Sequence, residues 1–317
     1  MRVYIVKRFL MTLAVLLLAI TFLSLLVQIV PGDPAKTLLG PRASPELIAR
    51  VRETMDLDKP VYVQVGKFLW NILHGSLGVD VFTGVPINEL VGSALPHTII
   101  LAITSLVLAV LIGIPLGVFS ATHPNSWLDR FTAILSISFT TIPSYVAGLF
   151  LLLIFAVKLR VLPAMGLGED GNILDYLKHL LLPAIALAIT WIGYLARLIR
   201  VSLLEVLNET YVRAARAGGL SERLVRYKYA LKNALIPTVA VLGVGLGSLM
   251  GGAVLVEIIF SRSGMGMLIF QAIKARNYPV VRAGVLVVAF LFVLVNLIAD
   301  LVYTYLDPRI HLDKRQN

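Results

Sequence analysis

Six runs of the sequence lack any charged side chain and approach or exceed the length needed to cross a lipid bilayer. They cover residues 9–30, 98–122, 131–157, 180–196, 234–256 and 283–299. About 20 apolar residues in a helix span a ~30 Å hydrocarbon core. Hydrophobic residues make up 58% of the chain and charged residues 15%, against about 45–50% and about 25% in soluble domains. We therefore predict an all-α, polytopic membrane protein with about six transmembrane helices.

The distribution of positive charge predicts the orientation of these spans. The first run is longer than the roughly 7–15 apolar residues of a cleaved signal peptide and ends in Pro and Gly, so we expect an uncleaved helix. With the N-terminus inside the cell, segment 197–232 places eight of the chain's 28 Lys and Arg residues on the cytoplasmic face. Both termini, including the tail 307–317, are then cytoplasmic. The net charge of +10 needs no nucleic-acid partner.

Segment 31–94 is expected to be an extracytoplasmic loop that contains two amphipathic helices. The first follows Ser44-Pro45-Glu46, a cap, a first-turn proline and an acid, and repeats Leu47, Val51 and Met55 at helical spacing. The second begins near Pro60 and has one apolar face, formed by Val61, Val65, Phe68 and Ile72. These helices lie either on the membrane surface or against the protein's own extracytoplasmic side.

Small and hydroxylated residues stand out within two of the predicted spans. Gly243, Gly247 and Gly251 form a smooth stripe on one face of the fifth predicted span. This stripe serves either packing within the chain, or a subunit interface or the lining of the pathway. The third run places hydroxyls around Pro143, which removes one backbone hydrogen bond. Those hydroxyls either satisfy the freed carbonyls or form a polar wall along a translocation route. The candidate pathway residues are Ser136, Thr140, Thr141, Ser144 and Ser248.

Residues typical of catalysis, metal binding or proton transfer are missing or scattered. The chain has no Cys, and its five His residues lack metal-ligand spacing. Glu257 and Asp300 lie near opposite ends of their spans, so the middle of the membrane lacks the charged relay of a proton-coupled carrier. A secondary carrier or channel and a membrane-embedded enzyme stay as rival hypotheses. We expect a transport subunit that is not an enzyme.

The segment between the fourth and fifth spans has the pattern helix, break, helix. Residues 203–217 contain no helix breaker, Gly218 and Gly219 supply a flexible stop, and Ser221 with Glu222 can cap the next, basic helix. Ala214 and Ala215 leave a low surface that another protein can approach closely.

This segment resembles the Glu-Ala-Ala loop of ABC importer permeases, in which two small residues precede a glycine and a short coupling helix sits in a groove of the ATPase. Arg213 occupies the glutamate position and Lys232 replaces a later proline, both changes being typical of the dipeptide/oligopeptide branch. The resemblance assigns coupling to the ATPase to Tyr211, Arg213, Ala214, Ala215, Arg216, Gly218, Gly219 and Glu222.

Further segments resemble the same branch over nearly the whole chain. They are Val30-Pro31-Gly32-Asp33-Pro34, Leu57-Asp58-Lys59-Pro60, His74-Gly75-Ser76-Leu77-Gly78, Glu257-Ile258-Ile259-Phe260-Ser261, Gly264-Met265-Gly266, Asn277-Tyr278-Pro279-Val280-Val281 and Asp307-Pro308-Arg309-Ile310. Arg262-Ser263 stands where the family usually has Trp-Pro, so Arg262, Gly264 and Gly266 are candidate contacts for a binding protein. The long outer loop resembles the first of the two permeases in such systems.

The resemblance implies a type I ABC importer transmembrane domain over residues 95–306, with its coupling loop at 201–233. It implies an ATP-driven importer of dipeptides or oligopeptides in the inner or plasma membrane of a bacterium or archaeon, with nickel or glutathione import as the alternative. The implied partners are a second homologous permease, two ATP-binding subunits and an extracytoplasmic solute-binding protein. This chain has no phosphate-binding loop motif, so ATP and Mg are expected on the partner ATPases and no cofactor on this chain.

Overall fold

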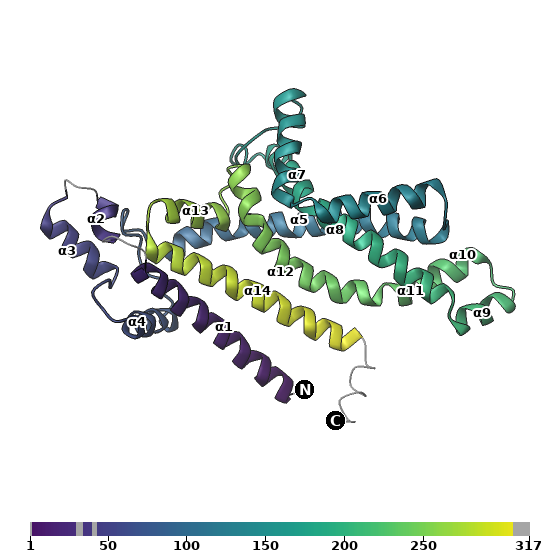
Figure 1. Cartoon of the computed structure of the whole chain (residues 1–317), viewed down its shortest axis with the longest axis horizontal. Coiled ribbons are helices and arrows are strands. Elements are labelled where there is room, and N and C mark those ends of the chain that lie inside the picture. Colours follow the sequence, from purple (N-terminus) through teal and green to yellow (C-terminus); the bar gives the residue numbers. More distant parts are fainter. Residues whose placement is uncertain (1, 30–33, 40–42, 307–317) are drawn as a thin grey trace. The chain divides into compact units, whose positions relative to one another are not determined.

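The computed structural model describes residues 2–29, 34–39 and 43–306, and these fold almost entirely as helices (Figure 1). An isolated bridge between Val79 and Pro86 is the only β-type pairing among them. Four described helices are long and apolar enough to cross a membrane, a bent helix pair makes a fifth candidate, and α1 contains a shorter apolar stretch at 10–25. Nearly all residues of the six predicted runs lie in helices; Ile142, Pro143 and Leu235 fall between helices. Val30 lies outside the described residues, as do the segment 31–33 and the tail 307–317.

The chain divides into two compact units. Unit 1 comprises residues 1–98 and 262–293, and unit 2 comprises 99–261 and 294–317. The helices of unit 1 are α1 (Arg2–Ile29), α2 (Pro34–Leu39), α3 (Pro45–Thr54), α4 (Val61–Leu73), the start of α5 (Ile87–Thr122), α13 (Met265–Lys274) and most of α14 (Tyr278–Leu306). Those of unit 2 are the rest of α5, α6 (Trp127–Thr141), α7 (Ser144–Leu151), the π-helical η1 (Leu152–Lys158), α8 (Ile173–Leu207), α9 (Thr210–Ala217), α10 (Glu222–Leu224), the π-helical η2 (Val225–Ala230), α11 (Leu231–Ala234), α12 (Ile236–Ile259) and the end of α14.

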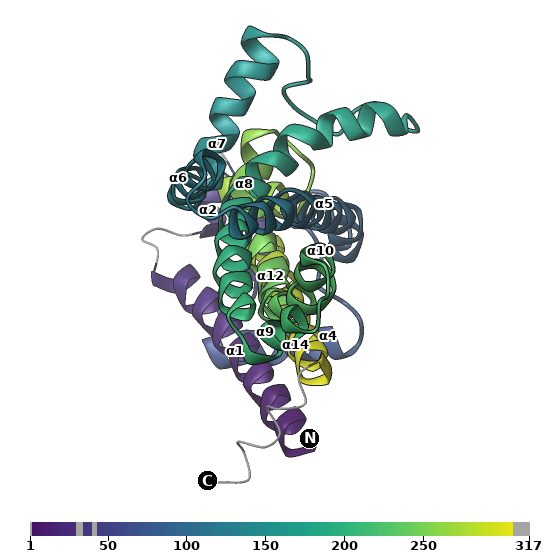
Figure 2. The same cartoon turned by 90° about the vertical axis from the view of Figure 1, so that its right-hand side faces the viewer.

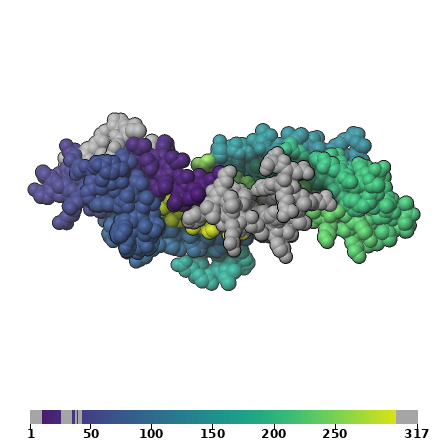
Figure 3. All heavy atoms as spheres, turned by 90° about the horizontal axis from the view of Figure 1, so that it is seen from below, coloured from purple at the N-terminus to yellow at the C-terminus, as the bar shows by residue number. Residues whose placement is uncertain are grey.

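The two predicted helices of segment 31–94 are confirmed in unit 1. The backbone N–H of Leu47 donates to the Ser44 hydroxyl at 3.3 Å, which caps α3, and Pro45 occupies the first turn. Helix α4 begins directly after Pro60 and buries Phe68 in an apolar cluster. In Figure 3, α4 and α1 lie against each other. The helices of this segment therefore pack onto apolar residues of their own unit.

Unit 2 is built around α8, which lies beside α5, α6, α7 and α12 (Figures 1 and 2). Two glycines set the close approach of its neighbours. A Cβ atom on Gly193 of α8 would lie 2.7 Å from the Ser136 carbonyl oxygen of α6, and one on Gly117 of α5 would lie 2.5 Å from the Ala196 carbonyl oxygen. Only glycine permits such backbone contact, as is typical of helix packing in membranes.

Two predicted helices are interrupted, and in both cases the prediction was wrong about continuity. The third run consists of α6 and of α7 with η1, which meet at an angle of 104°. Ile142 adopts an extended conformation because Pro143 follows it and disfavours helical geometry. The segment 203–217 also breaks, since α8 ends at Leu207 and α9 begins at Thr210, although no Gly or Pro lies between them.

Candidate functional site

The α8–α12 loop, residues 208–235, is anchored to unit 2 by an apolar cluster. Val212 of α9, Val225 and Ala230 of η2, and Ala234 of α11 have no exposed surface. They pack against the apolar side chains of Val118, Ala121, Ile199 and Leu203 on α5 and α8. Because α9, η2 and α11 all bury side chains in the same cluster, the loop forms a folded extension of α5 and α8.

Hydrogen bonds within the loop hold its helices together. The Glu222 carboxylate accepts from Arg216 Nε at 2.8 Å and from Arg226 Nε at 3.1 Å, which joins α9 to α10 and η2. The Tyr211 hydroxyl donates to the Tyr229 carbonyl at 3.4 Å and accepts from Asn233 Nδ2 at 2.7 Å. Two residues predicted for coupling, Arg216 and Glu222, thus pair with each other, while Tyr211 connects the two ends of the loop.

The turn of the loop presents a small, exposed surface. Gly219 has φ +79°, a left-handed conformation that favours glycine, and a Cβ there or on Gly218 would meet no close side chain. Arg213, Ala214 and Arg216 are exposed, whereas Ala215 is partly buried. Ser221 precedes α10, but its side chain makes no capping hydrogen bond. In Figure 3 the loop, drawn green, lies at the molecular surface.

The bend between α6 and α7 forms one wall of a cavity of about 350 Å³ inside unit 2. Predicted residues from three elements meet there, namely Thr140, Thr141, Ser144 and Ser248. The cavity is also lined by Tyr145, Thr190 and Trp191. No charged side chain lines it, and the hydroxyls and aromatic rings offer hydrogen bonds and flat apolar contacts.

Hydroxyl groups near the bend also donate hydrogen bonds to backbone carbonyls of α6. Thr140 Oγ1 donates to the carbonyl of Ser136 at 2.9 Å, and Thr141 Oγ1 donates to that of Ile137 at 2.8 Å. Ser136 itself is buried and does not line the cavity, because its backbone lies against Gly193 of α8. The structure therefore separates Ser136 from the other four candidate pathway residues.

The predicted glycine stripe divides between buried and open positions. A Cβ on Gly243 would lie 2.0 Å from the Cβ of Ala299 of α14, and Gly247 is buried. Gly251 is exposed and has no neighbouring atom within 4 Å of such a Cβ. Internal packing therefore accounts for Gly243, while the face at Gly251 is open in this chain.

The three candidate binding-protein contacts are not accessible in the structure. Arg262 has no exposed surface, and Gly264 and Gly266 are buried at the start of α13. The α13 N-terminus is held by the Thr98 hydroxyl, which accepts from the Met265 N–H at 2.8 Å. Their contact with a binding protein stays a prediction, and in this structure the exposed residues beside them are Ser261 and Ser263.

One partly buried ion pair that joins two helices was not predicted from the sequence. Asp129 of α6 is buried and forms a two-pronged ion pair with Arg200 of α8, at 2.6 Å to Nε and 2.9 Å to Nη2. It also accepts a hydrogen bond from Ser120 of α5. The pairing is long-range, so only the folded chain brings these side chains together. In the described part of the chain no group of three His, Cys, Asp or Glu side chains is suited to a metal ion.

The chain matches two family models. Residues 113–312 match the model described as binding-protein-dependent transport system inner membrane component, and residues 1–85 match the N-terminal model of such membrane components. A dipeptide transport system permease protein of Alkalihalophilus pseudofirmus is 39% identical, covering 98% of this chain and 99% of that protein. A glutathione transport system permease protein of Salmonella paratyphi A is 36% identical, covering 97% and 98%.

Solved structures agree with this assignment at the level of the fold. An inward-facing structure of the MetNI methionine ABC transporter matches with a TM-score of 0.58 and 19% identity, covering 69% of this chain and 97% of the matched chain. A likeness at that identity supports the architecture alone. Together with the family models and the near full-length relatives, it shows that the chain belongs to the family of binding-protein-dependent inner-membrane transport components and is the permease subunit of an ABC importer, not an enzyme.

Proposed function

We propose that this chain is the first-type permease of an ATP-driven importer of dipeptides or oligopeptides. The relative named for dipeptide transport, similar over nearly its whole length, supports this substrate class. The relative named for glutathione transport supports glutathione, itself a short peptide, as the second candidate. The cavity fits both, because uncharged hydroxyls can bind peptide groups without rejecting either terminal charge.

The proposed complex pairs this chain with a second homologous permease, two ATP-binding subunits and an extracytoplasmic solute-binding protein. Both termini and the α8–α12 loop then face the cytoplasm, where the ATPases bind ATP and Mg and this chain binds no cofactor. The excess of Lys and Arg between 197 and 232 supports that orientation. The host membrane is the inner or plasma membrane of a bacterium or archaeon.

The observation that carries the proposal is the construction of the α8–α12 loop. Its buried side chains join it to α5 and α8, and its exposed residues at Arg213 and Ala214 offer a low surface to another protein. A displacement of that surface by the ATPase is transmitted to α8, and α8 contributes Thr190 and Trp191 to the cavity. A nucleotide-driven movement of the ATPases then changes access to the cavity, provided that the contacts differ between the two states.

Substituting Ala214 by Trp tests the coupling role. The position is exposed on a helix, so the variant is expected to fold and to assemble while a bulky ring separates the loop from the ATPase. In the reconstituted importer we expect ATP hydrolysis to become independent of the binding protein and uptake to fall by more than about tenfold, equivalent to about 1.4 kcal/mol of coupling. Ala49→Trp, on the exposed face of α3, is the matched control. Full coupled uptake by Ala214→Trp would contradict the assignment.

The substrate class is tested separately by identifying what the cognate binding protein carries. Mass spectrometry of ligand released from the purified binding protein is expected to detect short peptides. Detection of glutathione alone would favour the second candidate, and detection of a nickel complex would refute peptide import while leaving the coupling role of the loop intact.

A further inference from the structure

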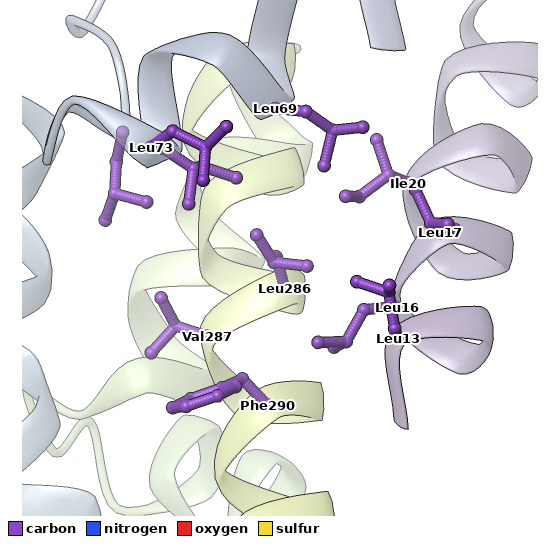
Figure 4. A pocket seen from close by; sticks show the side chains of 11 residues that line it. Leu13, Leu16, Leu17, Ile20, Leu69, Leu73, Leu286, Val287 and Phe290 are labelled. Atoms are coloured by element: carbon purple, nitrogen blue, oxygen red, sulfur yellow. The ribbon is translucent and has the colours of Figure 1, made fainter. Parts of the chain in front are cut away.

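Unit 1 contains a second cavity, of about 570 Å³, whose lining consists of hydrocarbon side chains alone. Three helices line it, together with Leu77 from the turn after α4. Figure 4 shows Leu16 and Ile20 of α1 facing Leu286 of α14, with Leu69 of α4 between the two helices at one end. Leu73 at the same end is 79% exposed, so the cavity is an open groove. Its hydrocarbon lining offers a water molecule no polar partner.

A cationic side chain lies on α14 close in sequence to the residues that line this groove. Arg282 lies one helical turn before Leu286 on α14, and its guanidinium carbon is 4.7 Å from the centre of the Phe68 ring, next to Leu69 of the groove. Among the described residues no carboxylate lies within ion-pair distance of Arg282. Asp56, which attracts it from further away, is already paired with two lysines, at 2.7 and 2.8 Å.

We infer that the groove between α1, α4 and α14 binds one acyl chain of an anionic phospholipid, whose phosphate pairs with Arg282. The groove belongs to a chain that lies in a membrane, and lipid tails are the abundant apolar molecules there. A bare apolar groove fits any tail, whereas the adjacent half-buried guanidinium favours a lipid with a negative headgroup. This charge complementarity distinguishes a phospholipid from an apolar helix of a partner permease.

The experiment measures phospholipid retained by the intact importer. The complex is reconstituted in vesicles of equal phosphatidylglycerol and phosphatidylethanolamine, extracted in mild detergent and analysed by native mass spectrometry. We expect one retained phosphatidylglycerol. Val287→Trp fills the groove and is expected to lower retention by about tenfold, since each displaced methylene weakens binding. Leu18→Trp, at an exposed position of α1 outside the lining, is the control.

The headgroup is tested through Arg282. Arg282→Gln is expected to abolish the preference for phosphatidylglycerol over phosphatidylethanolamine, and Arg282→Lys to keep it. Size-exclusion chromatography of each variant establishes that the complex is assembled. Retention that is unaffected by Val287→Trp, or a cross-link from position 287 to the partner permease in place of lipid, would overturn the inference. Neither result bears on the coupling loop, so the proposed function is tested independently.

Discussion

The carboxylate of Asp129 joins three helices of unit 2, and replacing it by the amide of Asn tests how much this junction stabilises the unit. Asp129 accepts from Arg200 Nε and Nη2, from the Ser120 hydroxyl, and from the Asn125 N–H at 2.9 Å. The substitution keeps the shape but removes the charge and places an amide NH₂ group against donors. Arg200 is then left without its partner.

The expected loss follows from the burial of the two side chains. Removing one member of a fully buried ion pair costs about 3–5 kcal/mol. Asp129 is 5% exposed but Arg200 is 31% exposed, so water can solvate part of the freed guanidinium. We therefore expect a loss of about 2–3 kcal/mol, at or below the lower end of that range. At about 2–4 °C per kcal/mol, the melting temperature should fall by about 4–12 °C.

Intrinsic fluorescence is a suitable assay, because Trp127 and Trp191 lie on the two helices that the ion pair joins. Thermal unfolding in detergent would be compared with that of Glu222→Gln, which removes the exposed pairs of Glu222 with Arg216 and Arg226. The side chains of Arg216, Arg226 and Glu222 are 37%, 35% and 51% exposed. Such exposed pairs contribute about 0–1 kcal/mol. Equal melting temperatures for the two variants would refute the argument from burial.

Two further predictions concern packing and pH. Gly243→Ala should destabilise the isolated chain by about 1–3 kcal/mol, because the added methyl group collides with Ala299. Gly251→Ala adds a methyl group at an open position, so the melting temperature of the isolated chain should stay within about 1 °C. Size-exclusion chromatography of the complex would detect a role of Gly251 in a subunit contact. Burial opposes ionisation of Asp56, but hydrogen bonds from two lysines outweigh it and lower its pKa. The ionised Asp56 therefore stabilises the fold above about pH 4, and this stabilisation is lost as the pH falls through the lowered pKa. Amide hydrogen exchange in α3 and α4 should accelerate in that acidic range. If Asp56→Asn kept the same acid sensitivity as the unchanged protein, the prediction would be contradicted.

The membrane class and most helices were predictable because they depend on local composition. A long uncharged run has only one satisfactory backbone arrangement in lipid, since a helix satisfies its own hydrogen bonds. The cap at Ser44 and the left-handed turn at Gly219 are also local, and both occur where the sequence predicts them. The family resemblance of the α8–α12 loop rests on a contiguous motif for the same reason.

Only the folded chain decided which side chains meet. The Asp129–Arg200 pair joins residues 71 positions apart, and no local pattern marks either one as a partner of the other. Thr140 and Ser248 share a cavity because α6, α7, α8 and α12 come together around it, while Ser136 of the same hydroxyl-rich run packs against α8 instead. The burial of Arg262 likewise reflects long-range packing. Burial and cavities depend on how helices approach one another, and that is set by contacts such as Gly117 with Ala196, distant in sequence.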